Sequence, residues 1–195
     1  MKFTKVPETT FQQLQLNAGV LLNTFNPETP VVESASIVGA TSGGVKFSAV
    51  PTYKDMGEGI DNMPKNMKEL KEIESMDIKM NGTFLTVTAE TVKTLIGSAD
   101  IDKADSTKIV PRSTLTDEDF TDIWWVGDYS DKNGESNGGF IAIHMMNALN
   151  TAGFSFQSAD REKGQFAFDF TAHYSMAAQD LVPFEVYIKS GTEEA

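Results

Sequence analysis

The sequence predicts a mainly β fold: an antiparallel β-sandwich or partly closed barrel, with one flanking α-helix and a long inter-strand loop. Apolar and polar residues alternate with a period of two along several segments, which is the pattern of half-buried strands. Turn-forming residues separate these segments at regular intervals. A helical period is confined to one short segment. The 195 residues suit a single domain, 1–195, and a hydrophobic content of 40% with 13 Phe is enough for a core.

The clearest strands lie in the first half of the chain. From Met76 to Phe84 apolar residues fall on alternate positions with one exception, which predicts a strand with one buried face. Residues 45–53 alternate in the same way. Pro51 lacks a backbone donor, so this strand is predicted to end there or to lie at a sheet edge.

The one predicted helix runs from Thr88 to Gly97. Val92, Leu95 and Ile96 recur at helical spacing, so one stripe of the helix should face a core. Thr88 has the side-chain oxygen that caps the first turn. Gly97 is expected to end the helix because glycine adopts left-handed backbone angles without steric cost.

The other elements are predicted from alternation and turn residues. Residues 1–10 are polar and are expected to form a flexible N-terminal arm. Strands are expected at 14–22, 31–38, 108–115, 120–129, 140–146, 154–156, 166–174 and 182–189. Turns or bends are expected at 39–44, 99–106, 128–137, 147–153 and 159–164. In the last strand the expected inward residues are Val182, Phe184, Val186 and Ile188.

The connection Lys54–Glu72 is long for a compact domain. Loops of more than about 12–15 residues without structure of their own are usually functional or disordered. Two interpretations stay open: a solvated hairpin tip, or an arm that packs on a neighbouring molecule. In the second case its apolar contacts would be Met56, Ile60, Met63, Met67 and Leu70.

Charge and composition exclude several classes of protein. The net charge is -12, and residues 100–135 contain ten acids against four bases. This balance argues against tight nucleic-acid binding, which needs basic residues. The acidic run is either a solvated face or a surface that repels DNA. The absence of cysteine excludes disulfides, thiolate metal sites and a Cys nucleophile.

No motif points to catalysis or to a bound ion. Residues 128–136 resemble a calcium loop superficially, but Tyr129 and Phe140 stand where that loop needs acids, so we expect a hairpin tip. His144 and His173 lack the spacing of a ligand pair. Adjacent residues of a strand point to opposite faces, so Trp124-Trp125 cannot form one flat sugar platform.

Two stretches carry a resemblance to a known family. The first is GATSGGVKFSAVPTYKD, followed after the long loop by IKMNGTFLTVTAETVKTLIGSAD. The second is GGFIAIHMMNALNTAGFSFQSADREKGQFAFDFTAHYS, closing with VPFEVYIKSG. Together they are similar to the tail tube protein (major tail protein) of long-tailed bacteriophages over about Gly39–Gly191. The order and spacing of the elements carry this resemblance.

The resemblance implies a structural virion protein that is not an enzyme and has no cofactor. Hexameric rings would stack into a tail tube, assembled in the bacterial host cytoplasm, through which DNA passes as transient cargo. Its partners would be copies of itself and other tail proteins, such as tape measure and tail-end proteins, with no membrane involved. The loop 54–72 and the segment 1–10 would reach an adjacent ring. Several acids of one set would line the lumen: Asp117, Glu118, Asp119, Asp122, Asp128 and Asp131.

Two alternatives remain from the sequence. One is a β-sandwich binding module, either carbohydrate-binding or adhesive. The other is a different virion component, such as a tail-terminator or decoration protein.

Overall fold

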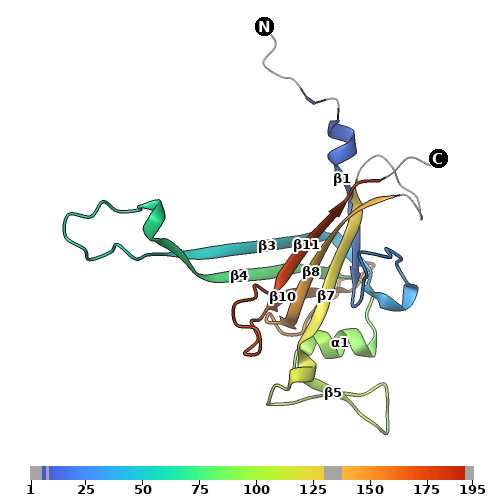
Figure 1. The fold of residues 1–195 in the computed structure, drawn as a ribbon. Coiled ribbons are helices and arrows are strands. Elements are labelled where there is room, and N and C mark those ends of the chain that lie inside the picture. The colour runs from blue at the N-terminus through green and yellow to red at the C-terminus, as the bar shows by residue number, and fades with distance from the viewer. Residues whose placement is uncertain (1–5, 8, 130–137, 192–195) are drawn as a thin grey trace.

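The computed structural model describes residues 6–7, 9–129 and 138–191 (Figure 1). Most of the predicted N-terminal arm, most of the predicted turn 128–137 and Asp131 therefore lie outside the described residues. The described part is mainly antiparallel β, which confirms the predicted fold class. The strands are β1 Gln15–Leu22, β2 Ile37–Gly39, β3 Thr41–Asp55, β4 Lys71–Phe84, β5 Ala99–Ile101, β6 Ile109–Pro111, β7 Thr121–Tyr129, β8 Gly139–Asn150, β9 Ser155–Gln157, β10 Gln165–Ala172 and β11 Phe184–Lys189. The helical elements are η1 Thr10–Gln13, η2 Ser34–Ser36, η3 Lys68–Leu70, α1 Ala89–Ile96 and η4 Asp117–Asp119.

Nine strands form one bent sheet, and β5 and β6 form a separate pair. The order along the sheet is β2-β1-β7-β8-β10-β4-β3, with β11 paired to β8 and β9 paired to β10. β8 pairs with β11 along its first half and with β10 at its end. The sheet bends at this change of partner, and the β3–β4 ribbon crosses the β7–β8–β11 layer (Figure 1). The sheet does not close into a barrel, so the architecture is sandwich-like.

The main core fills the space between the two layers. Its fully buried side chains include Leu21, Ile78, Met80, Phe84, Leu95, Met145 and Phe170. Phe47 of β3 packs on Phe184 of β11, with ring centroids 5.5 Å apart. The alternation predicted for residues 76–84 is confirmed. Its one exception, Gly82, lies against Phe168, where an added Cβ would come within 2.7 Å of the ring.

A second, smaller core lies on the other face of β1, β7 and β8. It consists of Leu22, Trp124, Val126, Phe140 and Ala142, and Phe25 of the 23–36 loop covers it. β7 is therefore buried on both faces from Ile123 to Gly127. Trp124 and Trp125 point into different clusters, as predicted from strand geometry.

The helix α1 has the predicted boundaries. The Thr88 hydroxyl accepts a hydrogen bond from the Thr91 backbone N–H, and Glu90 lies in the first turn. Gly97 has φ +85° and donates its N–H to the Lys93 carbonyl. Leu95 is fully buried in the main core, so α1 packs on the sandwich as a flanking helix.

Several predicted boundaries are wrong because bulges and edge positions override local signals. Residues 31–36 form irregular chain and η2, and only β2 at 37–39 is a strand there. The predicted turn 39–44 is largely the start of β3, where Gly43 and Gly44 at φ +76° and +80° form a bulge. β3 continues through Pro51 at the sheet edge, which is one of the two placements predicted for this proline.

Two further boundaries and one prediction of burial also differ from the structure. The predicted turn 99–106 begins with β5, and β8 extends to Asn150, with Asn147 in a left-handed conformation where a bend was expected. Val186 and Ile188 alternate with Phe184 as predicted but are exposed. Phe47 packs on Phe184, whereas Val186 and Ile188 lie farther along β11 and remain exposed.

Candidate assembly surfaces

The most prominent surface is the β3–β4 hairpin, which projects from the sandwich (Figure 1). We call residues 50–77 the arm. Its two strands stay paired out to Asp55↔Lys71, so the predicted loop 54–72 is shorter by two residues at each end. Val50, Tyr53 and Ile73 are 58%, 54% and 58% exposed. The arm therefore presents apolar side chains to solvent along its length.

The arm tip, residues 56–70, is folded rather than extended. The Asp55 carboxylate accepts hydrogen bonds from the backbone N–H groups of Gly57 and Asn66, each at 2.9 Å. The hydrogen bond from Asn66 has the larger effect and that from Gly57 the smaller, and together they lower the pKa of Asp55 below its ordinary value. The Met56 N–H donates to the Leu70 carbonyl at 2.8 Å. The tip thus has a defined shape before any partner binds.

The five apolar residues predicted for the arm divide into two groups. Met56 and Ile60 are about half exposed to solvent. The remaining three are partly buried: Met63, Met67 and Leu70. Leu70 and Met63 lie against the backbone at Gly57, so they shape the tip. Sequence periodicity could not separate these roles, because the tip is irregular.

Among the described residues, β2, β3, β9 and β11 each pair with one neighbouring strand only, and β3 is the longest of these four edge strands. The outer side of the 15-residue β3 has no partner strand among the described residues, whereas the opposite edge, β2, has three residues. Unpaired N–H and C=O groups on such an edge can pair with a strand of another molecule. β3 therefore offers both an arm and a long open edge.

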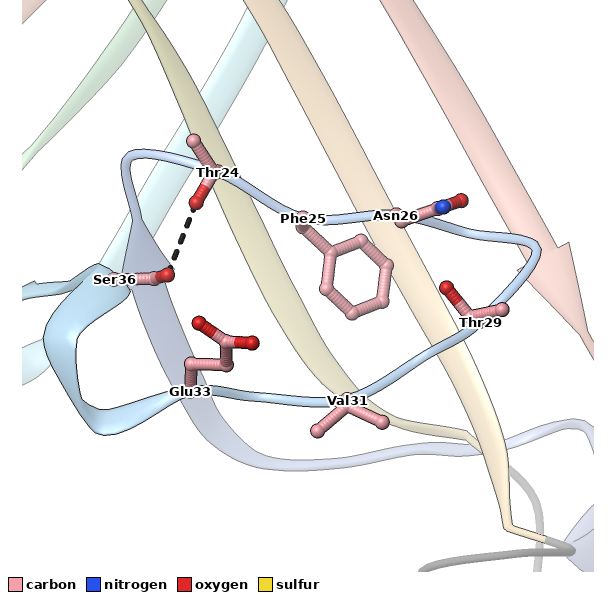
Figure 2. A pocket seen from close by; sticks show the side chains of 7 residues that line it. All are labelled: Thr24, Phe25, Asn26, Thr29, Val31, Glu33 and Ser36. Carbon is pink, nitrogen blue, oxygen red and sulfur yellow. Dashed lines mark hydrogen bonds between the residues drawn. The ribbon is translucent and has the colours of Figure 1, made fainter.

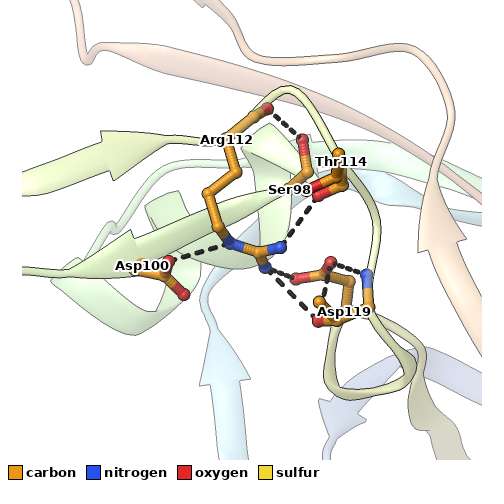
Figure 3. Close-up of polar contacts among 6 residues, drawn as sticks. Ser98, Asp100, Arg112, Thr114 and Asp119 are labelled. Atoms are coloured by element: carbon orange, nitrogen blue, oxygen red, sulfur yellow. Dashed lines mark hydrogen bonds and ion pairs between the residues drawn. The ribbon is translucent and has the colours of Figure 1, made fainter.

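One of the acids predicted to face a lumen has a structural role instead. The Asp119 side chain is buried and forms an ion pair with Arg112 (Figure 3). Its carboxylate also accepts a hydrogen bond from the Thr116 N–H at 2.7 Å, which completes a capping box. Arg112 Nε lies 2.9 Å from the Asp100 carboxylate. Asp119 therefore does not line a lumen, because its carboxylate is buried and paired with Arg112 inside the fold.

This cluster also lowers the pKa of Asp119. Burial alone would raise the pKa, but the hydrogen bonds from Thr116 and the Arg112 guanidinium outweigh it. Arg112 further donates to the Thr114 carbonyl, and its own carbonyl accepts a hydrogen bond from Ser98 Oγ. The cluster links β5, β6 and η4.

The four other described acids of the predicted lumen set are exposed. Asp117 and Glu118 lie on η4, whereas Asp122 and Asp128 share one face of β7. Glu185 of β11 lies on this same face. His144 of β8 pairs with Trp124 of β7 on one side and with Glu185 of β11 on the other, so the three side chains share one face of the sheet. The sequence placed Glu185 outward but gave no signal that it joins the β7 acids.

His144 is held between two of these acids. Its Nε2 lies 3.1 Å from Asp122 Oδ2 and its Nδ1 lies 3.6 Å from Glu185 Oε2. The imidazole stacks on Trp124 with ring centroids 3.9 Å apart. Lys189 on β11 shares this face of the sheet. We call this surface, with Asp122, Asp128 and Glu185, the acidic face.

A hollow lies under the 23–36 loop, with a volume of about 430 Å³ (Figure 2). Its lining residues are Thr24, Phe25, Asn26, Thr29, Val31, Glu33 and Ser36. Sequence reasoning missed it because it placed a strand at residues 31–38. The asparagine-proline and threonine-proline pairs at 26–27 and 29–30 were the signal for irregular chain.

Neither a metal cluster nor a membrane-spanning helix is found in the described residues. No group of three or more His, Cys, Asp or Glu side chains could hold a metal ion there. The helices in that part of the chain are all too short or too polar to cross a bilayer. Comparison of the chain with protein-family models gives no match, and comparison with curated proteins gives none either.

Proposed function

We propose that this protein is a structural subunit that assembles with copies of itself into hexameric rings, stacked as the tail tube of a long-tailed bacteriophage. The observation that carries the proposal is the arm, which extends beyond the sandwich with apolar side chains exposed. The rings would enclose a conduit for DNA during infection, and other tail proteins would bind at its ends.

The arm favours a partner for energetic reasons. A two-stranded hairpin is at best marginally stable in water on its own. Val50 and Ile73 are each 58% exposed. Full burial of such a side chain contributes about 1.5–3 kcal/mol, so covering the exposed half would add roughly 1–1.5 kcal/mol for each. A neighbouring subunit would provide this cover along the whole arm.

The open edge and the acidic face support the two other parts of the proposal. A closed ring needs a heterologous contact, in which one patch meets a different patch on the next copy. The unpaired edge of β3 can extend the sheet into a neighbour. A channel lined by the acidic face would not retain DNA, since binding by counterion release requires positive charge.

The sugar-binding alternative has little support from the described residues. Trp124 and Trp125 are both buried and lie on opposite faces of β7. A different virion component would share the arm and the edge, but a tail terminator would form single rings. Stacking into continuous tubes is therefore the property that separates these roles.

The experiment is a deletion with a matched control. Because Asp55 pairs with Lys71, residues 56–70 can be replaced by an Asn-Gly turn without breaking the hairpin. We expect this variant to fold, by circular dichroism, but to form no tubes in negative-stain electron microscopy. In the control, Asn-Gly replaces residues 158–164, the turn between the paired residues Gln157 and Gln165. Tubes of normal length from the arm-tip deletion would refute the role of the arm.

A further inference from the structure

The arm and the 23–36 loop lie on opposite sides of the molecule (Figure 1), and the hollow is lined by residues of that loop. Two different patches on opposite sides produce a head-to-tail contact when copies associate. Neither patch can reach the other within one chain.

The 23–36 loop is acidic, and its own hydrogen bonds hold its shape. It contains Glu28 and Glu33 and no Lys or Arg. The Thr24 and Ser36 hydroxyls are 3.0 Å apart and the Asn23 N–H donates to the Ser36 carbonyl at 2.9 Å, so the base of the loop is closed. Within the loop, the Glu28 N–H donates to Asn26 Oδ1 at 2.9 Å.

Apolar surface lies directly beside this charge. Phe25 packs on Trp124 and Phe140 with ring centroids 5.7 and 5.4 Å apart, which fixes its position in the hollow. Figure 2 shows Val31 across the hollow from Phe25, with the Glu33 carboxylate to one side. Val31 is 67% exposed although it belongs to an ordered loop. The hollow is thus suited to a long apolar side chain that comes with a positive charge.

The matching segment is residues 62–68 of the arm tip, NMPKNMK. It carries Lys65 and Lys68 and two methionines, Met63 and Met67. The acids Asp61 and Glu69 flank it. The one ion pair there, between Lys68 and Glu69 at 3.5 Å, joins two highly exposed side chains and contributes little. Methionine is unbranched and adapts to irregular apolar surfaces, including aromatic rings.

We propose that residues 62–68 of one copy dock on the 23–36 loop of a second copy. The exposed parts of the two methionine side chains would cover Phe25 and Val31, and the two lysines would face Glu28 and Glu33. This inference rests on the proposed function and specifies which surface receives the arm. It also explains how a chain of net charge -12 can associate with itself, because the contact brings opposite charges together.

The test is a charge reversal with restoration. One variant carries Glu28→Lys and Glu33→Lys, and the other carries Lys65→Glu and Lys68→Glu. We expect each alone to raise the protein concentration needed for assembly by about tenfold, which corresponds to roughly 1.4 kcal/mol. An equal mixture of the two should form the contact between unlike copies and assemble near the wild-type concentration. The control reverses Asp160 and Glu162, which lie on the exposed 158–164 turn.

Crosslinking provides a second readout that does not depend on assembly strength. The chain has no cysteine, so Pro64→Cys on one copy and Val32→Cys on a size-tagged copy give the only thiols. A short bismaleimide should join the two copies, whereas Asp160→Cys in place of Val32→Cys should give little product. Assembly of both charge variants at the wild-type concentration, or equal crosslinking at Asp160, would overturn this inference and leave the proposed function standing. A wild-type protein that stays monomeric at every concentration would overturn both.

Discussion

Phe168 of β10 packs on Gly82 of β4 in the main core, and we expect this contact to contribute to stability. Phe168 is 2% exposed, and its ring lies 4.4 Å from that of Phe84 and 5.2 Å from that of Phe170. Truncation of a buried Phe to Ala usually costs about 3–5 kcal/mol, because a cavity remains. For a chain of this length that lowers the melting temperature by roughly 6–20 °C.

Gly82→Ala perturbs the same contact from the opposite side. The added Cβ would approach Phe168 Cζ to 2.7 Å and the Gly44 carbonyl oxygen to 3.2 Å. Overpacking of this kind costs about 1–3 kcal/mol. In the Phe168→Ala background the ring is absent, and the methyl group can occupy part of the vacated space. The double variant should therefore be less destabilised than the sum of the two single variants.

The assay is urea unfolding at a concentration at which the protein is monomeric, because assembly would raise the apparent stability. Phe156→Ala is the matched control, since Phe156 is 53% exposed on β9. We expect a small change for this control. Two results would contradict the packing of Phe168 on Gly82 in the core. One is additive changes in the free energy of unfolding for Gly82→Ala and Phe168→Ala, and the other is equal losses of stability for Phe168→Ala and Phe156→Ala.

Two further predictions concern charge. The folded-state pKa of Asp119 is lowered, so its contribution to stability is present above the ordinary carboxyl pKa and is lost as pH falls through the folded value. The variant Asp119→Asn should be less stable than wild type near neutral pH and should lose less stability on acidification, measured by urea midpoints across pH; identical pH profiles would contradict the buried ion pair. For the acidic face, tubes assembled from Asp128→Lys should bind fluorescent double-stranded DNA at low salt, unlike wild-type tubes and an Asp160→Lys control. Equal binding by Asp128→Lys and Asp160→Lys tubes would mean that Asp128 does not line the channel.

The parts of the fold that follow from local rules were predictable. Alternation placed Ile78, Met80 and Phe84 on the buried face of β4. The caps Thr88 and Gly97 set the ends of α1 because their roles depend on the side chain and backbone of single residues. Pro51 cannot donate to a second ladder, which predicted that β3 ends there or lies at a sheet edge, and the structure has the edge position.

The candidate surfaces were only partly predictable. Length and composition identified the arm, but the sequence could not show that its strands remain paired to Asp55↔Lys71 or that its tip is folded. The acidic run was evident, yet Asp119 is removed from it by Arg112, seven positions earlier in the chain, through a contact that periodicity does not describe. The hollow under the 23–36 loop depends on Phe25 packing across the sheet.

The sequence alone thus determined the helix, most of the strands and the buried face of β4, and that the chain is acidic. These properties depend on neighbours a few positions apart, and local sterics and amphipathicity decide them. The tertiary structure alone decided where β8 changes partner from β11 to β10, that the arm leaves on the side opposite the 23–36 loop, and which carboxylates stay free. These depend on contacts between residues distant in the chain, whose register and bulges are set when the two layers pack together.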